Sequence, residues 1–475
     1  MLLPETALVF CVGDVSLLPN MNSTLWLLLV GVSVGLVVLR LKLLRSAHCT
    51  YVDPVLWYHV TWAGTLAVYG VYRPLYHFRL DWPFDVLLVA YVVALGAGLW
   101  LGCPVSRMRR RHAVDHRCPP HILPASILLR TILMMAVDVV AGLLLASVLA
   151  RGYPLKAMFS DRSFANMASS FKEIVGLVFL EGLQVSLAFD FFLRTDGGIH
   201  DVGIIGLAIV PSIIRTGLTA GRSALVLQAL LLALVWLSAE HGRSLFSRKG
   251  LALASVAVTD LVCLFVVVDA ARRSGALVLP GLADFRALLD YIVLPTDGFG
   301  YYLQPGLEQL HGRALTYIFP WVANQLGRFL PGYGPLDKDI IASVQTVLRT
   351  IDDYLVTTTR TAFGDFQLGL GTFWGLAWAL VWGLIVGKVH TTAVRLNRFG
   401  WTVLSCLDVL VVAWTPQMYY YFSSWYVLTL LAAWICLALG NVLRTSLWLK
   451  HSRSVPEGHH RLDISDSSTA SQERQ

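Results

Sequence analysis

Arginine side chains give the first chemical signal in this sequence of 475 residues. The segment 270–368 holds seven arginines and one lysine, and two more arginines border the break in IIRTGLTAGRSALVL. A guanidinium offers a planar pair of donors to phosphate oxygens and keeps its charge when water is excluded. The excess of arginine over lysine therefore predicts a site for a phosphate-bearing ligand. The candidate ligand-binding residues are Arg215, Arg222, Arg272, Arg273 and Arg313.

The segment TTTRTAFGDFQLGLGTFWGLAWALVWGLIVG carries a second signal. Arg360 precedes Asp365 by five residues, and the glycines that follow allow the backbone to come close to a neighbour or a ligand. A carboxylate or an imidazole can remove the proton from an attacking hydroxyl. We therefore regard Arg360 as a catalytic cation and either Asp365 or His311, the loop's only histidine, as the base, with Glu308 and Asp297 as further candidates for that role.

The composition places these residues in a membrane protein. Apolar residues make up 56% of the chain and charged residues 14%, with a mean hydropathy of +0.64, whereas a soluble domain carries about 25% charged residues. The apolar residues fall in blocks of about 20, which match a bilayer core about 30 Å thick. We therefore predict an all-α polytopic membrane protein, which excludes a water-soluble enzyme, a disordered chain and a β-barrel.

The apolar blocks predict about eleven transmembrane helices. Their expected ranges are 24–44, 54–72, 83–103, 122–149, 174–193, 202–216, 222–239, 251–269, 369–387, 401–416 and 425–443. Alternate connections carry fifteen and eight Lys and Arg residues, and the richer set is cytoplasmic by the positive-inside rule. The rule puts segment 270–368 outside and the C-terminus inside the cell. It also accounts for the net charge of +7 without a nucleic-acid partner.

Four segments follow from these spans. They are the N-terminal transmembrane helices (1–269), a large external loop with short amphipathic helices (270–368), the C-terminal transmembrane helices (369–443) and a polar, disordered cytoplasmic tail (444–475). A connection of about a hundred residues is rarely only a linker, so we expect the loop to carry function.

Several charged side chains lie within the predicted spans. They are Arg130, Asp138, Glu181, Asp190, Asp260 and Asp408. A charge at the centre of a bilayer costs about 2.5 to 3.5 kcal/mol on insertion scales. Each of these side chains is therefore expected to face a partner or a wet cavity.

A succession of motifs resembles a known family. It consists of TAGRSALVLQALLLAL, DYIVLPTDGFGYYL, a stretch rich in Phe-Pro and Leu-Gly, and an Arg…Asp-Phe segment that runs into a Gly-rich helix. Over about residues 205–390 the chain is similar to the oligosaccharide repeat-unit polymerases, of which the O-antigen polymerases are the best known. Arg222 and the element from Arg360 to Phe366 match the family pattern, whereas Gln367 stands where a glycine is usual. Tyr291 of the second motif joins the expected substrate-binding residues.

The resemblance implies a membrane-embedded glycosyltransferase of the GT-C type. Such an enzyme polymerises oligosaccharide repeat units carried on undecaprenyl pyrophosphate into a surface polysaccharide, in the bacterial inner membrane and on its periplasmic side. The arginines would stabilise the departing pyrophosphate. Besides these substrates and membrane lipids, a chain-length regulator and a flippase are the partners that the resemblance implies.

Two other functions fit the same architecture. An O-antigen ligase would transfer the glycan to lipid A–core, and a flippase or transporter of lipid-linked oligosaccharides would use the charges within the spans.

No metal or other cofactor is expected. The seven cysteines form no CxxC pair and no His/Cys spacing typical of zinc. Asp337 and Asp339 match the DxD string of metal-dependent glycosyltransferases, but Asp337 is better interpreted as a helix N-cap.

Overall fold

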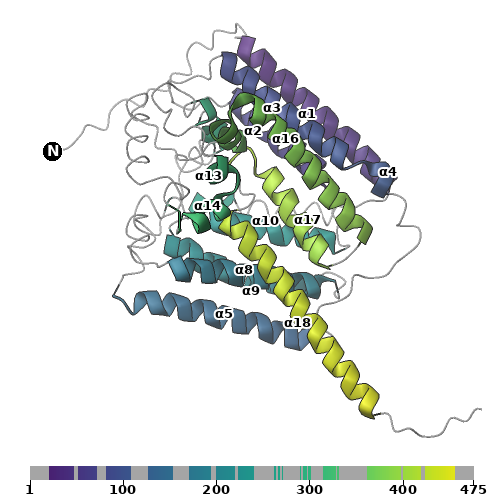
Figure 1. Ribbon diagram of the computed structural model, residues 1–475, viewed down its shortest axis with the longest axis vertical. Helices are drawn as coiled ribbons and strands as arrows, with labels where there is room; N and C mark the ends of the chain where they lie inside the picture. Colours follow the sequence, from purple (N-terminus) through teal and green to yellow (C-terminus); the bar gives the residue numbers. More distant parts are fainter. Residues whose placement is uncertain are drawn as a thin grey trace, which may run out of the picture.

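A computed structural model gives the fold of the chain (Figure 1). It describes residues 21–47, 52–71, 82–108, 127–152, 171–193, 199–219, 223–239, 262–263, 266–267, 270, 289, 292–296, 298–300, 314–327, 329–330, 361–396, 399–418 and 423–454. These residues form helices and no strand. The predicted all-α class is confirmed to this extent. The predicted span 251–269 lies almost entirely outside the described residues.

The described helices follow the predicted apolar ranges. Their bounds are α1 (Met21–Ser46), α2 (Pro54–Val71), α3 (Trp82–Gly102), α4 (Val105–Met108), α5 (Ile127–Leu149), α8 (Phe171–Phe192), α9 (Ile199–Thr219), α10 (Ser223–Ser238), α13 (Ala314–Ile318), α14 (Pro320–Leu326), α16 (Ala362–Leu396), α17 (Phe399–Ala413) and α18 (Ser424–Ser454). α16 begins earlier than predicted, inside the segment assigned to the loop. α18 continues past 443 into the segment assigned to the tail.

Of the helices in the described ranges, six are long and apolar enough to cross a membrane: α1, α3, α5, α8, α9 and α16. α10, α17 and the first part of α18 are shorter apolar helices. α5 exposes much of its apolar surface, including Leu128, Val139 and Leu143. In a bilayer, acyl chains would cover such a face at little cost, since lipid is as apolar as leucine. These features are those of a polytopic membrane protein.

The helices pack in two groups (Figure 1). The first group contains α1, α2, α3 and α16, and the second contains α5, α8, α9, α10 and α18. α17 contacts α2 and α16 of the first group as well as α10 and α18 of the second. Its buried side chains belong to one large apolar core that includes residues of both groups. α17 therefore joins the two groups.

The closest helix contact in the first group is made by glycines. Gly98 and Gly102 on α3 face Gly383 and Gly387 on α16, each pair in the G-x-x-x-G spacing that brings two helix backbones together. A Cβ atom added to Gly383 would lie 2.5 Å from the Leu95 carbonyl oxygen. The α3–α16 contact therefore depends on the lack of a side chain at these positions. It brings the C-terminal end of α3 beside the C-terminal part of α16.

Candidate functional site

Two of the site residues predicted from the sequence are among the described residues. They are Arg215 near the end of α9 and Asp365 in the first turn of α16. α9 belongs to the second helix group and α16 to the first. The other predicted site residues lie outside the described residues: Arg222, Arg272, Arg273, Tyr291, His311, Arg313 and Arg360.

Asp365 lies in a short helical segment whose start is fixed from two directions. The Thr361 N–H donates to the Pro295 carbonyl at 3.2 Å, and the Ala362 N–H donates to the Thr415 carbonyl, just after α17, at 3.0 Å. The Asp365 side chain belongs to the buried face, with 7% of the residue exposed. A buried carboxylate at a helix N-terminus is stabilised by the helix dipole.

Gly371 ends this short segment. Its φ of 73° and ψ of −179° interrupt the helix within the Ala362–Leu396 range, and that backbone conformation is accessible almost only to glycine. The Gln367 side chain spans the interruption, because it accepts from the Tyr91 hydroxyl at 2.9 Å and donates to the Thr372 hydroxyl at 2.9 Å. Gln367 thus connects the broken helix to α3, on which Tyr91 lies.

Arg215 is held by a buried carboxylate. Its Nε lies 2.7 Å from Oε1 of Glu181 on α8, and the Glu181 side chain is fully buried while that of Arg215 is 11% exposed. Among the described residues, this ion pair through Nε is the contact that the structure records for the guanidinium. Within this part of the chain, no contact of the two terminal nitrogens of the fork is recorded.

The other charges within the predicted spans have partners, as expected. Arg130 on α5 pairs with Asp190 on α8 at 2.5 Å. Asp138 accepts from the Gln184 amide at 2.7 Å, and Asp408 accepts from the Tyr426 hydroxyl at 2.6 Å. Asp260 lies outside the described residues. These contacts join neighbouring helices within the second group and connect it to α17.

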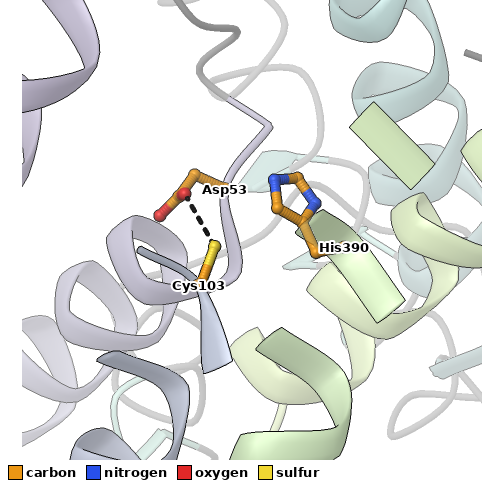
Figure 2. A group of neighbouring side chains, drawn as sticks. All are labelled: Asp53, Cys103 and His390. Atoms are coloured by element: carbon orange, nitrogen blue, oxygen red, sulfur yellow. Dashed lines mark hydrogen bonds between the residues drawn. The ribbon is translucent and has the colours of Figure 1, made fainter. Parts of the chain in front are cut away.

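A polar cluster that the sequence analysis missed lies in the first helix group (Figure 2). Asp53 precedes α2, Cys103 follows α3, and His390 lies in the last third of α16. Their ligand atoms lie within 4.8 Å of one another, and all three residues are buried. Asp53 also caps α2, since the Leu56 N–H donates to its Oδ1 at 2.9 Å. Because these residues are far apart in the chain, no spacing motif indicates the cluster.

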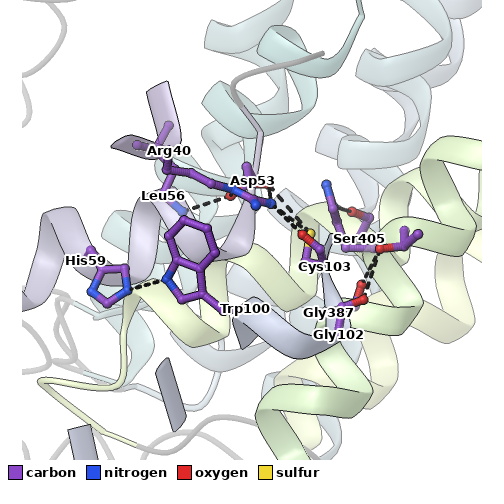
Figure 3. A network of polar contacts seen from close by, with 11 residues as sticks. Arg40, Asp53, Leu56, His59, Trp100, Gly102, Cys103, Gly387 and Ser405 are labelled. Atoms are coloured by element: carbon purple, nitrogen blue, oxygen red, sulfur yellow. Dashed lines mark hydrogen bonds and ion pairs between the residues drawn. The ribbon is translucent and has the colours of Figure 1, made fainter. Parts of the chain in front are cut away.

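Arg40 of α1 closes one side of this cluster (Figure 3). Its Nε donates to Oδ1 of Asp53 at 3.0 Å and one terminal nitrogen donates to Oδ2 at 2.6 Å. The same nitrogen lies 2.9 Å from the Cys103 carbonyl oxygen and 3.1 Å from Sγ. Its ring contact with Trp100, 5.1 Å from the ring centroid, adds a cation–π interaction.

Two hydrogen bonds position His390 and the backbone next to Cys103. The Ser405 hydroxyl on α17 lies 2.6 Å from Nδ1 of His390, which leaves Nε2 as the second ring nitrogen. The Thr391 hydroxyl donates to the Gly102 carbonyl at 3.1 Å, at the glycine contact between α3 and α16. The Cys103 thiol donates to Oδ2 of Asp53 at 3.6 Å.

Comparison with known proteins gives no further assignment. Protein-family models, curated proteins and solved structures were all searched, and none matches the chain.

Proposed function

We propose that the protein is a membrane glycosyltransferase that polymerises lipid-linked oligosaccharide repeat units. The observation that carries this proposal is the state of Arg215, whose Nε is held by buried Glu181 while its terminal nitrogens are free of recorded partners among the described residues. A guanidinium fixed in this way is oriented before a ligand arrives, so little ordering is required when phosphate oxygens bind. The motif resemblance over residues 205–390 supplies the identity of the phosphate-bearing substrate.

Asp365 is the proposed base, and it lies among the described residues. In the proposed reaction the carboxylate takes the proton of an acceptor sugar hydroxyl, and the hydroxyl oxygen bonds to the anomeric carbon of the donor. The bond from that carbon to the pyrophosphate oxygen breaks, and the oxygen leaves with the electron pair. Arginines stabilise the charge that develops on the leaving group, which makes a protonating acid unnecessary. His311 remains the alternative base.

The proposal includes a topology. About eleven transmembrane helices of a GT-C type enzyme would lie in a bacterial inner membrane, with segment 270–368 in the periplasm and the C-terminus in the cytoplasm. By the positive-inside rule, the C-terminal end of α9 and the N-terminal end of α16 then face the periplasm. Arg215 and Asp365, near these two ends, would lie on the same side of the membrane.

Deletion of the gene, followed by electrophoresis of the surface polysaccharide, tests the proposed function. Surface lipid capped by a single repeat unit is the result expected for a polymerase. A complete lack of capped lipid would instead identify a ligase. Accumulation of lipid-linked units on the cytoplasmic side would identify a flippase.

Two substitutions then test the site. Arg360→Ala should leave expression intact and abolish chains longer than one repeat, because the proposed pyrophosphate site loses a cation. Asp365→Asn should have the same effect on chain length if Asp365 is the base. Asp201→Asn is a matched control. Asp201 lies in the first turn of α9, at the predicted cytoplasmic side of the membrane, and accepts from the Trp236 indole N–H. A normal ladder of chain lengths in Arg360→Ala would remove Arg360 from the site.

A flippase or transporter is the second candidate, and the charges within the helices favour it. Two ion pairs, Arg130–Asp190 and Arg215–Glu181, join α5, α8 and α9, which are all long and apolar enough to cross a membrane. Intramembrane ionisable pairs are frequent along transport pathways. Reconstituted protein that moves labelled lipid-linked oligosaccharide across a vesicle membrane without extending it would support this function over polymerisation.

A further inference from the structure

The buried cluster of Asp53, Cys103 and His390 has the composition of a transition-metal site. It offers a carboxylate oxygen from the start of α2, a thiol sulfur from the end of α3 and an imidazole nitrogen from the last third of α16, and every pair of ligand atoms lies within 4.8 Å (Figure 2). These are the three ligand types that zinc prefers, at about 2.0 to 2.3 Å from the metal. Two ligand atoms on a tetrahedral ion of that size are about 3.3 to 3.8 Å apart. The Sγ of Cys103 and Oδ2 of Asp53 already have such a spacing, at 3.6 Å.

The surroundings of the cluster match those of a metal ligand set. Histidines that bind a metal almost always use their other ring nitrogen for a hydrogen bond, which fixes the ring orientation. His390 has this arrangement, because Nδ1 lies 2.6 Å from the Ser405 hydroxyl and Nε2 remains. The ring of His390 faces the space beside Cys103 and Asp53 in Figure 2.

Arg40 contacts two of the three proposed ligands from one side of the cluster (Figure 3), because it donates to both carboxylate oxygens of Asp53 and to Cys103. An ionised carboxylate oxygen has two lone pairs, so Oδ2 can accept from Arg40 and still bind a cation. Binding of a divalent ion would displace the thiol proton, and the ion, Arg40, the thiolate and the Asp53 carboxylate would together carry a charge of +1. Arg40 would then be an outer cation that orients the carboxylate.

We propose that Asp53, Cys103 and His390 bind one divalent transition-metal ion of the zinc class, with Ser405 and Arg40 as the residues that position the ligands. The ion would connect the start of α2, the end of α3 and the C-terminal part of α16. This site is distinct from Arg215 and Asp365, and it does not depend on the proposed function. A cluster held only by the Arg40–Asp53 pair and hydrogen bonds is the competing interpretation.

Cobalt binding to the purified full chain in detergent tests the site. After removal of bound metal with a chelator, Co²⁺ should bind at one ion per chain and give both ligand-field bands and a thiolate-to-cobalt charge-transfer band. Excess Zn²⁺ should abolish these bands by displacement. Wild-type protein without a charge-transfer band would overturn the proposal, because the thiolate is part of the predicted ligand set.

Variants locate the ion. Cys103→Ser should lose the charge-transfer band, and Cys406→Ser, which replaces another buried cysteine near Ser238, should keep it. Ser405→Ala should weaken Co²⁺ binding about 10- to 100-fold, as expected for a residue that orients a ligand. An unchanged band in Cys103→Ser would place the metal elsewhere and overturn the assignment.

A second version of the chain covers the case in which Cys103→Ser does not fold. It keeps Cys103 and replaces the other cysteines by serine. A charge-transfer band in this protein supports the site directly, and its absence in a folded sample contradicts it. Retention of polysaccharide polymerisation has no bearing on either result, so failure of this inference and failure of the proposed function are distinguishable.

Discussion

Arg40 and Arg215 are both buried beside a carboxylate, but their donors are used differently. Arg40 donates through Nε and one terminal nitrogen to Asp53, and that terminal nitrogen also reaches Cys103. Arg215 meets Glu181 through Nε, the inner nitrogen of the fork. The first arrangement uses two of the three guanidinium nitrogens of Arg40, whereas the pair of Arg215 is recorded through Nε alone among the described residues. The number of arginines in a sequence therefore indicates little about ligands until the partners of each are known.

The difference has a counterpart in the helices that carry the two residues. Arg40 lies in the group in which α3 and α16 are fixed by glycine contacts. Arg215 lies on α9, which contains Pro211 and therefore lacks one backbone donor in its interior. A closed ion pair in the tightly packed group is suited to stability. Arg215, on a helix with an internal proline, is the arginine that we propose binds a ligand.

The largest effect on stability is expected from loss of the Arg40–Asp53 ion pair. Arg40→Ala leaves the Asp53 carboxylate buried without its cation, and loss of one partner of a buried pair costs about 3 to 5 kcal/mol. The free energy of unfolding in mixed micelles measures this change. Arg40→Met combined with Asp53→Asn should recover most of the loss, because neither residue then leaves a buried charge. A single variant as stable as wild type would show that water or another group compensates Asp53.

Substitution of Arg215, which pairs with Glu181, should change activity. Arg215→Lys keeps a positive charge for Glu181 but removes the fork, so under the proposed function we expect glycan extension to slow about 10²-fold, or about 2.7 kcal/mol, as when one donor to a developing anion is lost. The rate of glycan extension by reconstituted protein measures this. Arg151→Lys is the matched control, since Arg151 also pairs with a glutamate of α8, Glu173. Equal rates in both variants would contradict the difference between the two arginines.

The next largest effect is expected from a substitution in the α3–α16 contact of the first helix group. Gly383→Ala places a Cβ 2.5 Å from the Leu95 carbonyl oxygen and 2.9 Å from the Leu99 nitrogen, and forced separation of packed elements costs about 1 to 3 kcal/mol. Thermal unfolding in detergent measures the loss. Gly142→Ala on α5 is the control, because an added Cβ there meets no atom of another described element within 4 Å. That control should be neutral or slightly more stable, by up to about 1 kcal/mol from helix propensity.

The smallest effect is expected from loss of the Arg151–Glu173 ion pair, in which the arginine is exposed. Arg151→Ala removes the contact with Glu173, but the Arg151 side chain is 44% exposed, and exposed pairs contribute about 0 to 1 kcal/mol. Denaturant unfolding of the purified protein should therefore shift little. A loss as large as that of Arg40→Ala would mean that exposure does not separate the two kinds of pair.

The sequence predicts the helices well because long apolar blocks have one structural solution in a membrane. The positions of α1, α3, α5, α8 and α16 follow from this. The start of α16 was placed too late because Thr361 to Leu370 is less apolar than the helix after Gly371 and is anchored by contacts with Pro295 and Thr415. The helical end of α18 was also missed, since its last turns are polar.

The sites were harder to predict than the helices. Partners for Glu181 and Asp190 were expected from the cost of burying charge, and the structure identifies them as Arg215 and Arg130. The cluster of Asp53, Cys103 and His390 has no local pattern, because packing of α3 on α16 brings its members together. The G-x-x-x-G spacings in both helices were the available signal for that packing. The assignments of Arg360 and His311 remain predictions.

The position of α17 between the two helix groups has a mechanical consequence. α17 touches α2 and α16 on one side and α10 and α18 on the other, and it also carries Ser405 and Asp408. Any rotation of one helix group against the other would therefore have to occur at the contacts of α17 with its neighbours. Such a rotation would change the separation of spin labels on α5 and α1, and a cross-link of α17 to both groups would prevent it.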